Sequence, residues 1–173
     1  MYVQQVSDEF DEIVSIEPFY SESSRYDITV EETHNFYVNG ILVHNCQNCF
    51  NEMFELSNSV ENGLDWYIEE KLDGCLTGST LISTDQGRFP IEDIVKNPKN
   101  YKVKSYDVNE EKIVFDTIVN VMKKPNDGKQ WFRLTLEDGK EIEITGNHKV
   151  YLPELKCWRK VENLCEGDVF LIE

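Results

Sequence analysis

The chain has 173 residues and a formal net charge of −16, and 40% of its residues are hydrophobic. This apolar content is enough for one hydrophobic core, so we expect one domain with or without an appendage. The acidic balance argues against nucleic acid or an anionic membrane as a partner. No apolar run approaches the about 20 residues of a membrane-spanning helix. The acidic start lacks the apolar stretch of a signal peptide, which predicts a cytoplasmic protein.

Five cysteines occur, at positions 46, 49, 75, 157 and 165. An odd number in a chain without a secretory signal disfavours a disulfide framework. Cys46 and Cys49 form a CxxC pair, which is typical of half a zinc site or of a redox pair. No second pair of ligands follows at similarly close spacing, and no βαβ pattern surrounds the first pair. The sequence therefore predicts neither a metal site nor a cofactor.

Charge divides the chain into three segments. Residues 1–45 have a net charge of −8, residues 46–74 of −6 and residues 75–173 of −2. Within the last segment, residues 96–133 hold nine basic and five acidic side chains. We therefore expect electrostatic steering to help the first and last segments associate, and the salt dependence of that association would test this.

The first segment is predicted to form short strands, over residues 11–19, 25–31 and 35–44. Asn39 and Gly40 stand between two apolar runs, and both residue types tolerate a positive φ, so a two-residue hairpin is predicted there. The middle segment differs, because the spacing of its apolar residues from Phe50 to Leu56 indicates a short helix within a loop.

The last segment is also rich in predicted strands, with one short helix predicted over residues 90–97. Asp-Gly pairs at 127–128 and 138–139 indicate two further hairpins. The predicted strands cover residues 79–90, 102–108, 112–122, 129–152 and 167–173. The predicted fold class is all-β, with a short helix and a small helical or loop insert.

Cys75 opens the stretch CLTGSTLI. A lone cysteine is most often a small buried hydrophobe, and that interpretation stays open. The stretch nevertheless resembles the first block of inteins, the self-splicing protein domains. That block begins with a nucleophilic cysteine, which is followed by an apolar residue, Gly, Thr and an apolar strand.

Thr145 and His148 lie three positions apart in ITGNHKVYL, at the end of a predicted strand. A Thr-x-x-His pair is common by chance, and a loop histidine with satisfied hydrogen bonds is the alternative. The pair resembles the intein block that surrounds the upstream scissile peptide. The resemblance implies that His148 strains this peptide and protonates the departing nitrogen, while Thr145 helps to hold the oxyanion.

The stretch YDITVEETHNFYVNGILVHNC carries the most specific resemblance, because it matches the two C-terminal intein blocks without a gap. Asp27, His34, His44, Asn45 and Cys46 are the matching positions. The resemblance implies that Asp27 shifts two thiols between their neutral and anionic forms. It also implies that Asn45 attacks its own backbone carbonyl with help from His44 and His34, and that Cys46 accepts the acyl group.

The resemblance covers residues 1–45 and 75–173, but in the opposite order to an ordinary intein. It implies the compact horseshoe of the Hint fold, built from both segments, with Cys75, His148, Asn45 and Cys46 converging at its centre. Gly74 would then be the scissile junction ahead of Cys75. Joined to Cys46, it would close residues 46–74 into a ring. No endonuclease helix pair is apparent, and the "GD" that inteins usually place after the short helix occurs only at Gly167–Asp168.

Three interpretations of the function remain open. The first is autocatalytic, single-turnover splicing in permuted order, in which the chain's own two halves associate. The second is a chain that carries halves of two different split inteins, each waiting for a complementary half in trans, or a trapped and inactive precursor. The third is a β-domain that only binds.

The end of the middle segment, EEKLDG, resembles motif I (KxDG) of ATP-dependent nucleic-acid ligases, in which the lysine carries AMP. Four matching characters are a weak motif, and a solvated charge cluster ahead of a glycine is the alternative. As a fragment of a ligase host, the stretch would be extein sequence. Lys71 lacks the remaining motifs, so the sequence predicts no ligase activity in this chain.

Overall fold

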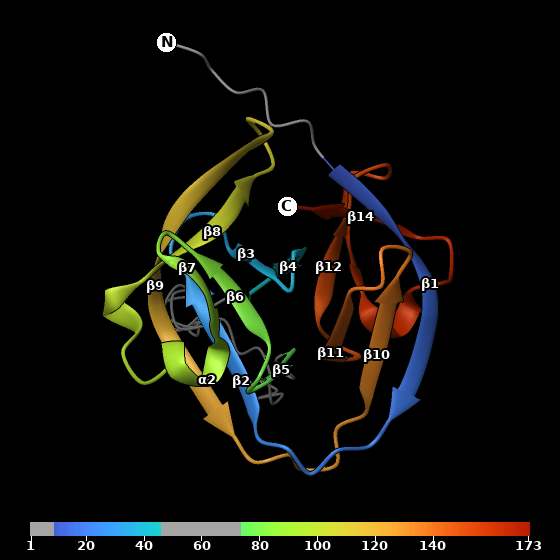
Figure 1. The fold of residues 1–173 in the computed structure, drawn as a ribbon, viewed down its shortest axis with the longest axis horizontal. Coiled ribbons are helices and arrows are strands. Elements are labelled where there is room, and N and C mark those ends of the chain that lie inside the picture. Colours follow the sequence, from blue (N-terminus) through green and yellow to red (C-terminus); the bar gives the residue numbers. More distant parts are fainter. Residues whose placement is uncertain (1–8, 46–73) are drawn as a thin grey trace, which may run out of the picture.

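The structure is a computed structural model that describes residues 9–45 and 74–173 (Figure 1). The expectations for Cys46, for the CxxC pair, for the helix after Phe50 and for the KxD part of the ligase-like motif lie outside the described residues. Within the described ranges the fold is all-β, as predicted. The first range forms four strands: β1 (Glu9–Phe19), β2 (Arg25–Val30), β3 (Asn35–Val38) and β4 (Ile41–His44).

The second range forms ten strands, one α-helix and two short 3-10 turns. The strands are β5 (Leu76–Thr77), β6 (Leu81–Thr84), β7 (Gly87–Pro90), β8 (Lys102–Asp107), β9 (Lys112–Lys124), β10 (Trp131–Leu136), β11 (Glu141–Thr145), β12 (Lys149–Leu152), β13 (Cys157–Lys160) and β14 (Val169–Ile172). The helix is α2 (Ile91–Ile94), and the 3-10 turns are η2 (Pro98–Asn100) and η3 (Val161–Asn163). The predicted helix is thus present but shorter than residues 90–97. No helix in the described ranges is long and apolar enough to cross a membrane.

The strands pair in one closed path. It runs from β4 through β14, β1, β10, β11, β5, β2, β9, β8, β6 and β3, and β3 pairs with β4 again. The ribbon follows this path as two curved lobes, with β4 and β5 between them (Figure 1). Because β1 and β2 pair on both edges with strands of the second range, neither range forms a sheet of this shape by itself.

Two predicted hairpins are confirmed. Val38 pairs with Ile41, and the turn residues Asn39 and Gly40 have φ values of 46° and 85°, as a type I′ turn requires. The turn also ties the lobes together, since the Asn39 side chain accepts from the Leu81 N–H at 2.9 Å and donates to the Glu141 carbonyl at 2.8 Å. The second hairpin joins β10 and β11 through residues 138–139.

The hairpin predicted at residues 127–128 was wrong. The flanking strand β9 pairs with β2 and β8. Along its length, β10 pairs with β1 on one edge and with β11 on the other, so β10 has no edge left for a β9–β10 pair. Gly128 does turn the chain, at a φ of 83°. Residues 125–130 cross from one lobe to the other beside residues 20–24 (Figure 1). The Asp-Gly signal therefore marks a crossover between lobes.

The core is one large cluster of buried side chains with a smaller aromatic cluster beside it. Trp131, Phe36, Phe170 and Ile28 are among the largest side chains that are almost fully buried. Each such side chain contributes about 1.5–3 kcal/mol through burial. Because these four come from both described ranges, the core depends on both.

Two strand ends from opposite ends of the chain lie side by side. Glu9 of β1 is opposite Ile172 of β14, in an antiparallel pair that runs to Glu12 and Val169. Gly167 and Asp168 extend this contact, because Gly167 donates to the Ile13 carbonyl at 2.9 Å and Ile13 donates back to Asp168 at 3.0 Å. Gly167 and Asp168 therefore help to join the start of β14 to β1.

Contacts between oppositely charged parts of the two ranges are mixed. Cations of the predicted basic region lie over aromatic rings of the first range, with Lys123 over Tyr26 and Arg133 over Phe19. The ion pair of Arg25 with Asp127, however, has its base in the acidic range. Steering of association by charge therefore stays a prediction.

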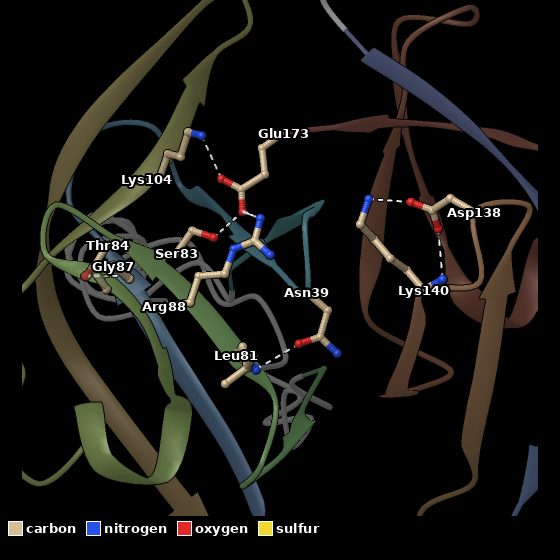
Figure 2. A network of polar contacts seen from close by, with 10 residues as sticks. All are labelled: Asn39, Leu81, Ser83, Thr84, Gly87, Arg88, Lys104, Asp138, Lys140 and Glu173. Carbon is tan, nitrogen blue, oxygen red and sulfur yellow. Dashed lines mark hydrogen bonds and ion pairs between the residues drawn. The ribbon is translucent and has the colours of Figure 1, made fainter.

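Glu173 joins the end of β14 to the opposite lobe (Figure 2). Its carboxylate pairs with Lys104 of β8 at 2.7 Å and with Arg88 of β7 at 3.1 Å, and it accepts a hydrogen bond from the Ser83 hydroxyl of β6. Burial alone would raise the pKa of Glu173, but the hydrogen bonds from Lys104 and Ser83 and the nearby positive charges lower it below its ordinary value. The network therefore favours the charged carboxylate.

Replacing Glu173 by Gln is expected to lower the free energy of unfolding by about 1–2 kcal/mol at pH 7, since three polar groups lose a charged partner. Because the folded pKa is lowered, this contribution is present above the unfolded pKa and is lost as pH falls through the folded value. Denaturant unfolding of a chain with Cys75→Ala and Asn45→Ala at pH 7 and pH 3 would measure both effects. Glu162→Gln, at an exposed pair with Lys160, is the control. An equal loss in both variants, or a loss as large at pH 3 as at pH 7, would contradict this role.

Candidate active site

Cys75 lies immediately before β5, between strands of both ranges. Its N–H donates to the Thr145 hydroxyl at 2.7 Å, and its carbonyl accepts from the Thr145 N–H at 3.0 Å. On the other side, Tyr26 pairs with Leu76 and Arg25 with Thr77. Continuing this register puts Asp27 opposite Cys75, and opposite side chains on paired strands lie on the same face. Cys75, Thr145 and Asp27 are 0%, 1% and 3% exposed, so water has little access to this group.

Gly74, the residue ahead of Cys75, lies directly against His148. A Cβ atom added to Gly74 would be 2.4 Å from Cα and 2.6 Å from Cβ of His148. The first of these contacts is with backbone, which cannot move aside as the end of a flexible side chain can. Only glycine therefore fits at this position, and the Gly74–Cys75 peptide lies between His148 and Thr145.

His148 closes a tight turn that begins at Thr145, to whose carbonyl its N–H donates at 3.1 Å. The side chain is 2% exposed. Burial, with a smaller effect of the nearby His44 side chain, lowers the pKa of His148 from 6.5 to about 3, although the backbone of His44 opposes part of the shift. No hydrogen bond of normal geometry reaches either ring nitrogen from the described residues. His148 is therefore a neutral imidazole at pH 7.

Asn45 follows β4 and is 1% exposed. Its N–H donates to the His34 carbonyl at 2.9 Å, which fixes its backbone. The Nδ1 atom of His44 lies 2.5 Å from the carbonyl oxygen of Asn45, a short hydrogen bond. The edge of the Trp158 ring meets the His44 ring at a centroid distance of 4.9 Å, which limits how the imidazole can turn. The hydrogen bond from His44 polarises the Asn45 carbonyl, which is the group that the Asn45 side chain would attack.

His34 sits at the end of a turn with a φ of 54°, and its Nδ1 atom is 3.1 Å from the Val30 carbonyl. Asp116 of β9 holds this turn by accepting from the N–H groups of Glu32 and Thr33 at 3.1 and 2.8 Å. Partial burial would raise the pKa of Asp116, but these hydrogen bonds and those from the Thr33 hydroxyl and the Thr117 N–H lower it overall. In the described contacts, His34 acts on Asn45 through its backbone.

The two predicted junctions meet at one place between the lobes. Gly74 touches His148, and the next residue, Lys149, pairs with His44, which contacts the Asn45 carbonyl. Of the predicted site residues, the structure brings together Cys75, Thr145, His148, Asp27, His44 and Asn45 with Gly74, while His34 supports the group from one side. Cys46 lies outside the described residues.

One residue of this site was missed from the sequence. A guanidinium nitrogen of Arg25 lies 3.9 Å from the Cys75 sulfur, and the side chain is buried. A signal was available, because Arg25 is the only lysine or arginine among residues 1–45. Arg25 lies two positions before Asp27 on a predicted strand. Residues two apart on a strand share a face, so the sequence places Arg25 on the same face as Asp27.

The site's polar groups are those of acyl transfer. A thiol, a peptide carbonyl and a neutral imidazole supply a nucleophile, an electrophile and a proton carrier. Within residues 9–45 and 74–173, no three His, Cys, Asp or Glu side chains gather closely enough to hold a metal ion.

Comparison with known proteins gives partial similarities. No protein-family model matches the chain. Over 100 residues it is 35% identical to the replication factor C small subunit of Methanocaldococcus jannaschii, covering 57% of this chain and 5% of that protein. Over 105 residues it is 31% identical to the replicative DNA helicase DnaB of Rhodothermus marinus, covering 55% of this chain and 10% of that protein. The chain thus spans a small part of each relative.

Proposed function

We propose that residues 1–45 and 75–173 form one intein-like Hint domain that splices itself, in permuted order, around residues 46–74. The observation that carries the proposal is that the Gly74–Cys75 peptide and the Asn45 carbonyl lie at one buried centre, each against a histidine. The domain would act once on its own chain and would need no cofactor.

In the first step, the Cys75 sulfur attacks the Gly74 carbonyl. A C–S bond forms, the Gly74–Cys75 C–N bond breaks, and the thiol proton is balanced by the proton that the new α-amine gains. Thr145 supports this step because its hydroxyl holds the Cys75 nitrogen at 2.7 Å. His148, neutral at pH 7 and in contact with Gly74, is placed to pass a proton to the departing nitrogen.

In the next step, the Gly74 acyl group passes from the sulfur of Cys75 to that of Cys46, the residue after Asn45. The side-chain nitrogen of Asn45 then attacks the Asn45 carbonyl, closes a succinimide and releases the amine of Cys46. The 2.5 Å contact of His44 with that carbonyl oxygen supports this step, since the oxygen gains negative charge. A final S-to-N shift would leave Gly74 joined to Cys46, so residues 46–74 would leave as a ring.

The comparisons support a transferable domain. Two relatives with different names, a replication factor and a helicase, each share about 100 residues with this chain, in 5% and 10% of their lengths. Similarity that is confined to a small part of two differently named proteins is more simply explained by a module of its own than by either activity. A host protein of this chain is therefore a separate question from the domain's reaction.

The second candidate is a chain whose halves belong to two different split inteins and react in trans. Interleaved pairing favours action in cis, because β1 and β2 each lie between two strands of the second range. The third candidate, a domain that only binds, leaves the buried junctions and the neutral His148 without a use.

Two blocking variants test the reaction. Asn45→Ala is expected to leave thiol-induced cleavage at Gly74–Cys75 while abolishing release after position 45, because only the side-chain nucleophile is lost. Cys75→Ala is expected to show the converse, with no thioester and slow release of residues 1–45. Intact mass after incubation with dithiothreitol would distinguish the two products. An acyl relay would be contradicted if each variant lost both cleavages, or if each variant kept both.

A further inference from the structure

We propose that Arg25 is a catalytic residue of the first step, whose guanidinium stabilises the thiolate of Cys75 as it attacks Gly74. The proposal rests on the proposed splicing function and adds a group to its site. It starts from the contact of Arg25 Nη1 with Cys75 Sγ at 3.9 Å, both side chains being buried.

Each part of the guanidinium has its own partner. Nε donates to the Pro125 carbonyl at 3.2 Å, Nη2 pairs with the Asp127 carboxylate at 2.8 Å, and Nη1 faces the sulfur. Pro125 and Asp127 belong to the crossover between the lobes. Two of the three contacts thus hold the group in place and the third is directed at the nucleophile.

The other polar side chains near Cys75 supply no positive charge. Asp27 lies on the same face of β2 as Arg25 and cannot carry one. His148, on the far side of Gly74, is neutral at pH 7 because burial lowers its pKa to about 3. Lys124 of β9 is opposite Arg25 in the strand pair. The guanidinium of Arg25 supplies a cation in contact with the sulfur.

A buried guanidinium remains charged, because arginine does not deprotonate in proteins. Its position beside a thiol favours the thiolate, which is the nucleophilic form. The thiol proton leaves the sulfur, the thiolate forms the bond to the Gly74 carbonyl carbon, and the α-amine of Cys75 takes up a proton. Arg25 changes neither protons nor bonds, so no further reactant is required.

Arg25 also makes the first step depend on both parts of the domain. It lies in the first described range, whereas Cys75 and Asp127 lie in the second. Cys75 therefore gains its cation only when β2 pairs with β5. Premature thioester formation in an unassembled chain would be slow for this reason.

The test measures thiol-induced cleavage at Gly74–Cys75 from pH 6 to pH 10 in the full chain, with Asn45→Ala and Cys46→Ala to block later steps. Arg25→Gln, Arg25→Lys and Asp127→Asn are compared with this parent. Dividing the rate of each variant by the rate of the parent at the same pH cancels the effect of dithiothreitol ionisation. Near-ultraviolet circular dichroism checks that each variant is folded.

Arg25→Gln is expected to shift the midpoint of the pH profile upward by about one pH unit, as loss of an adjacent cation does. At pH 7 its rate should fall about threefold, because a tenfold loss of thiolate is partly offset by a more nucleophilic thiolate. Above about pH 9 it should be as fast as the parent or faster. Arg25→Lys should shift the midpoint less, since it keeps the charge. Asp127→Asn should leave the midpoint unchanged or move it to a lower pH.

A rate for Arg25→Gln that falls by the same factor at every pH, or that matches the effect of Asp127→Asn, would assign Arg25 a structural role and overturn the proposal. If Arg25→Gln does not fold, Arg25→Lys decides the question. An unshifted pH profile of Arg25→Lys supports the role of charge, and a profile shifted as far as one pH unit overturns that role. If the parent cleaves, the proposed splicing function stands, whatever the Arg25 variants do. If the parent does not cleave, both the splicing function and the role of Arg25 are overturned.

Discussion

Replacing His148 by Gln is expected to slow cleavage at the Gly74–Cys75 bond by at least about 100-fold, the usual loss when a positioned proton donor is removed. Glutamine keeps a similar size but carries no proton that it can transfer. The rate is measured as thiol-induced cleavage of the full chain in the Asn45→Ala background, by intact mass. Release after Asn45 in a Cys75→Ala background should be affected much less, because His44 contacts that carbonyl.

The same variant has a second expected effect, on stability. The folded pKa of His148 is about 3 and its ordinary value is 6.5. Between these values the unfolded chain binds a proton that the folded chain does not, so stability is full above pH 6.5 and falls on acidification by at most about 1.4 kcal/mol per pH unit. His148→Gln should remove this slope between pH 6 and pH 4. A parent-like cleavage rate together with an unchanged slope would contradict a buried, neutral and catalytic His148.

Gly74→Ala is expected to slow the same cleavage by about 10–100-fold, since a reacting bond displaced by about 1 Å can lose about a factor of 100. The added methyl group would lie 2.4 Å from the His148 Cα, so either the peptide or the turn must move. The measurement is the thiol-induced cleavage rate in the Asn45→Ala background. The domain would therefore accept only glycine before Cys75 at full rate.

Gly128→Ala is the matched control for this variant. Gly128 has a φ of 83° with no atom within 4 Å of an added Cβ, so alanine there costs backbone strain without overlap. Its melting temperature should fall slightly while cleavage at Gly74 keeps its rate. Equal cleavage rates for the Gly74→Ala chain and its parent would mean that the junction is not held against His148.

The sequence was sufficient for the fold class and for most strands. The Asn39–Gly40 hairpin formed where predicted because its turn chemistry is local and both residues accept a positive φ. The same local rule failed at residues 127–128, since which strands pair is decided by distant partners. The two-residue strand β5 was also missed, because it exists only through pairing with β11 and β2.

For the site, the sequence supplied residue types and their spacing, but the contacts depend on the closed path of strands. Thr145 and Cys75 are 70 positions apart, and their 2.7 Å hydrogen bond follows from β5 lying beside β11. The neutrality of His148 follows from burial, which no spacing indicates. Arg25 was missed because its use depends on a sulfur 50 positions away and on the crossover that holds it.

The intact mass of freshly purified chain, before and after a thiol reductant is added at neutral pH, tests the central claim most directly. Splicing in cis predicts a new species lighter by one water than the free peptide of residues 46–74, together with the two excised segments 1–45 and 75–173. An unchanged mass over many hours, with free thiols verified by titration and the domain folded, would contradict splicing in cis. Supplying complementary intein halves would then distinguish a chain that acts in trans from one that does not react.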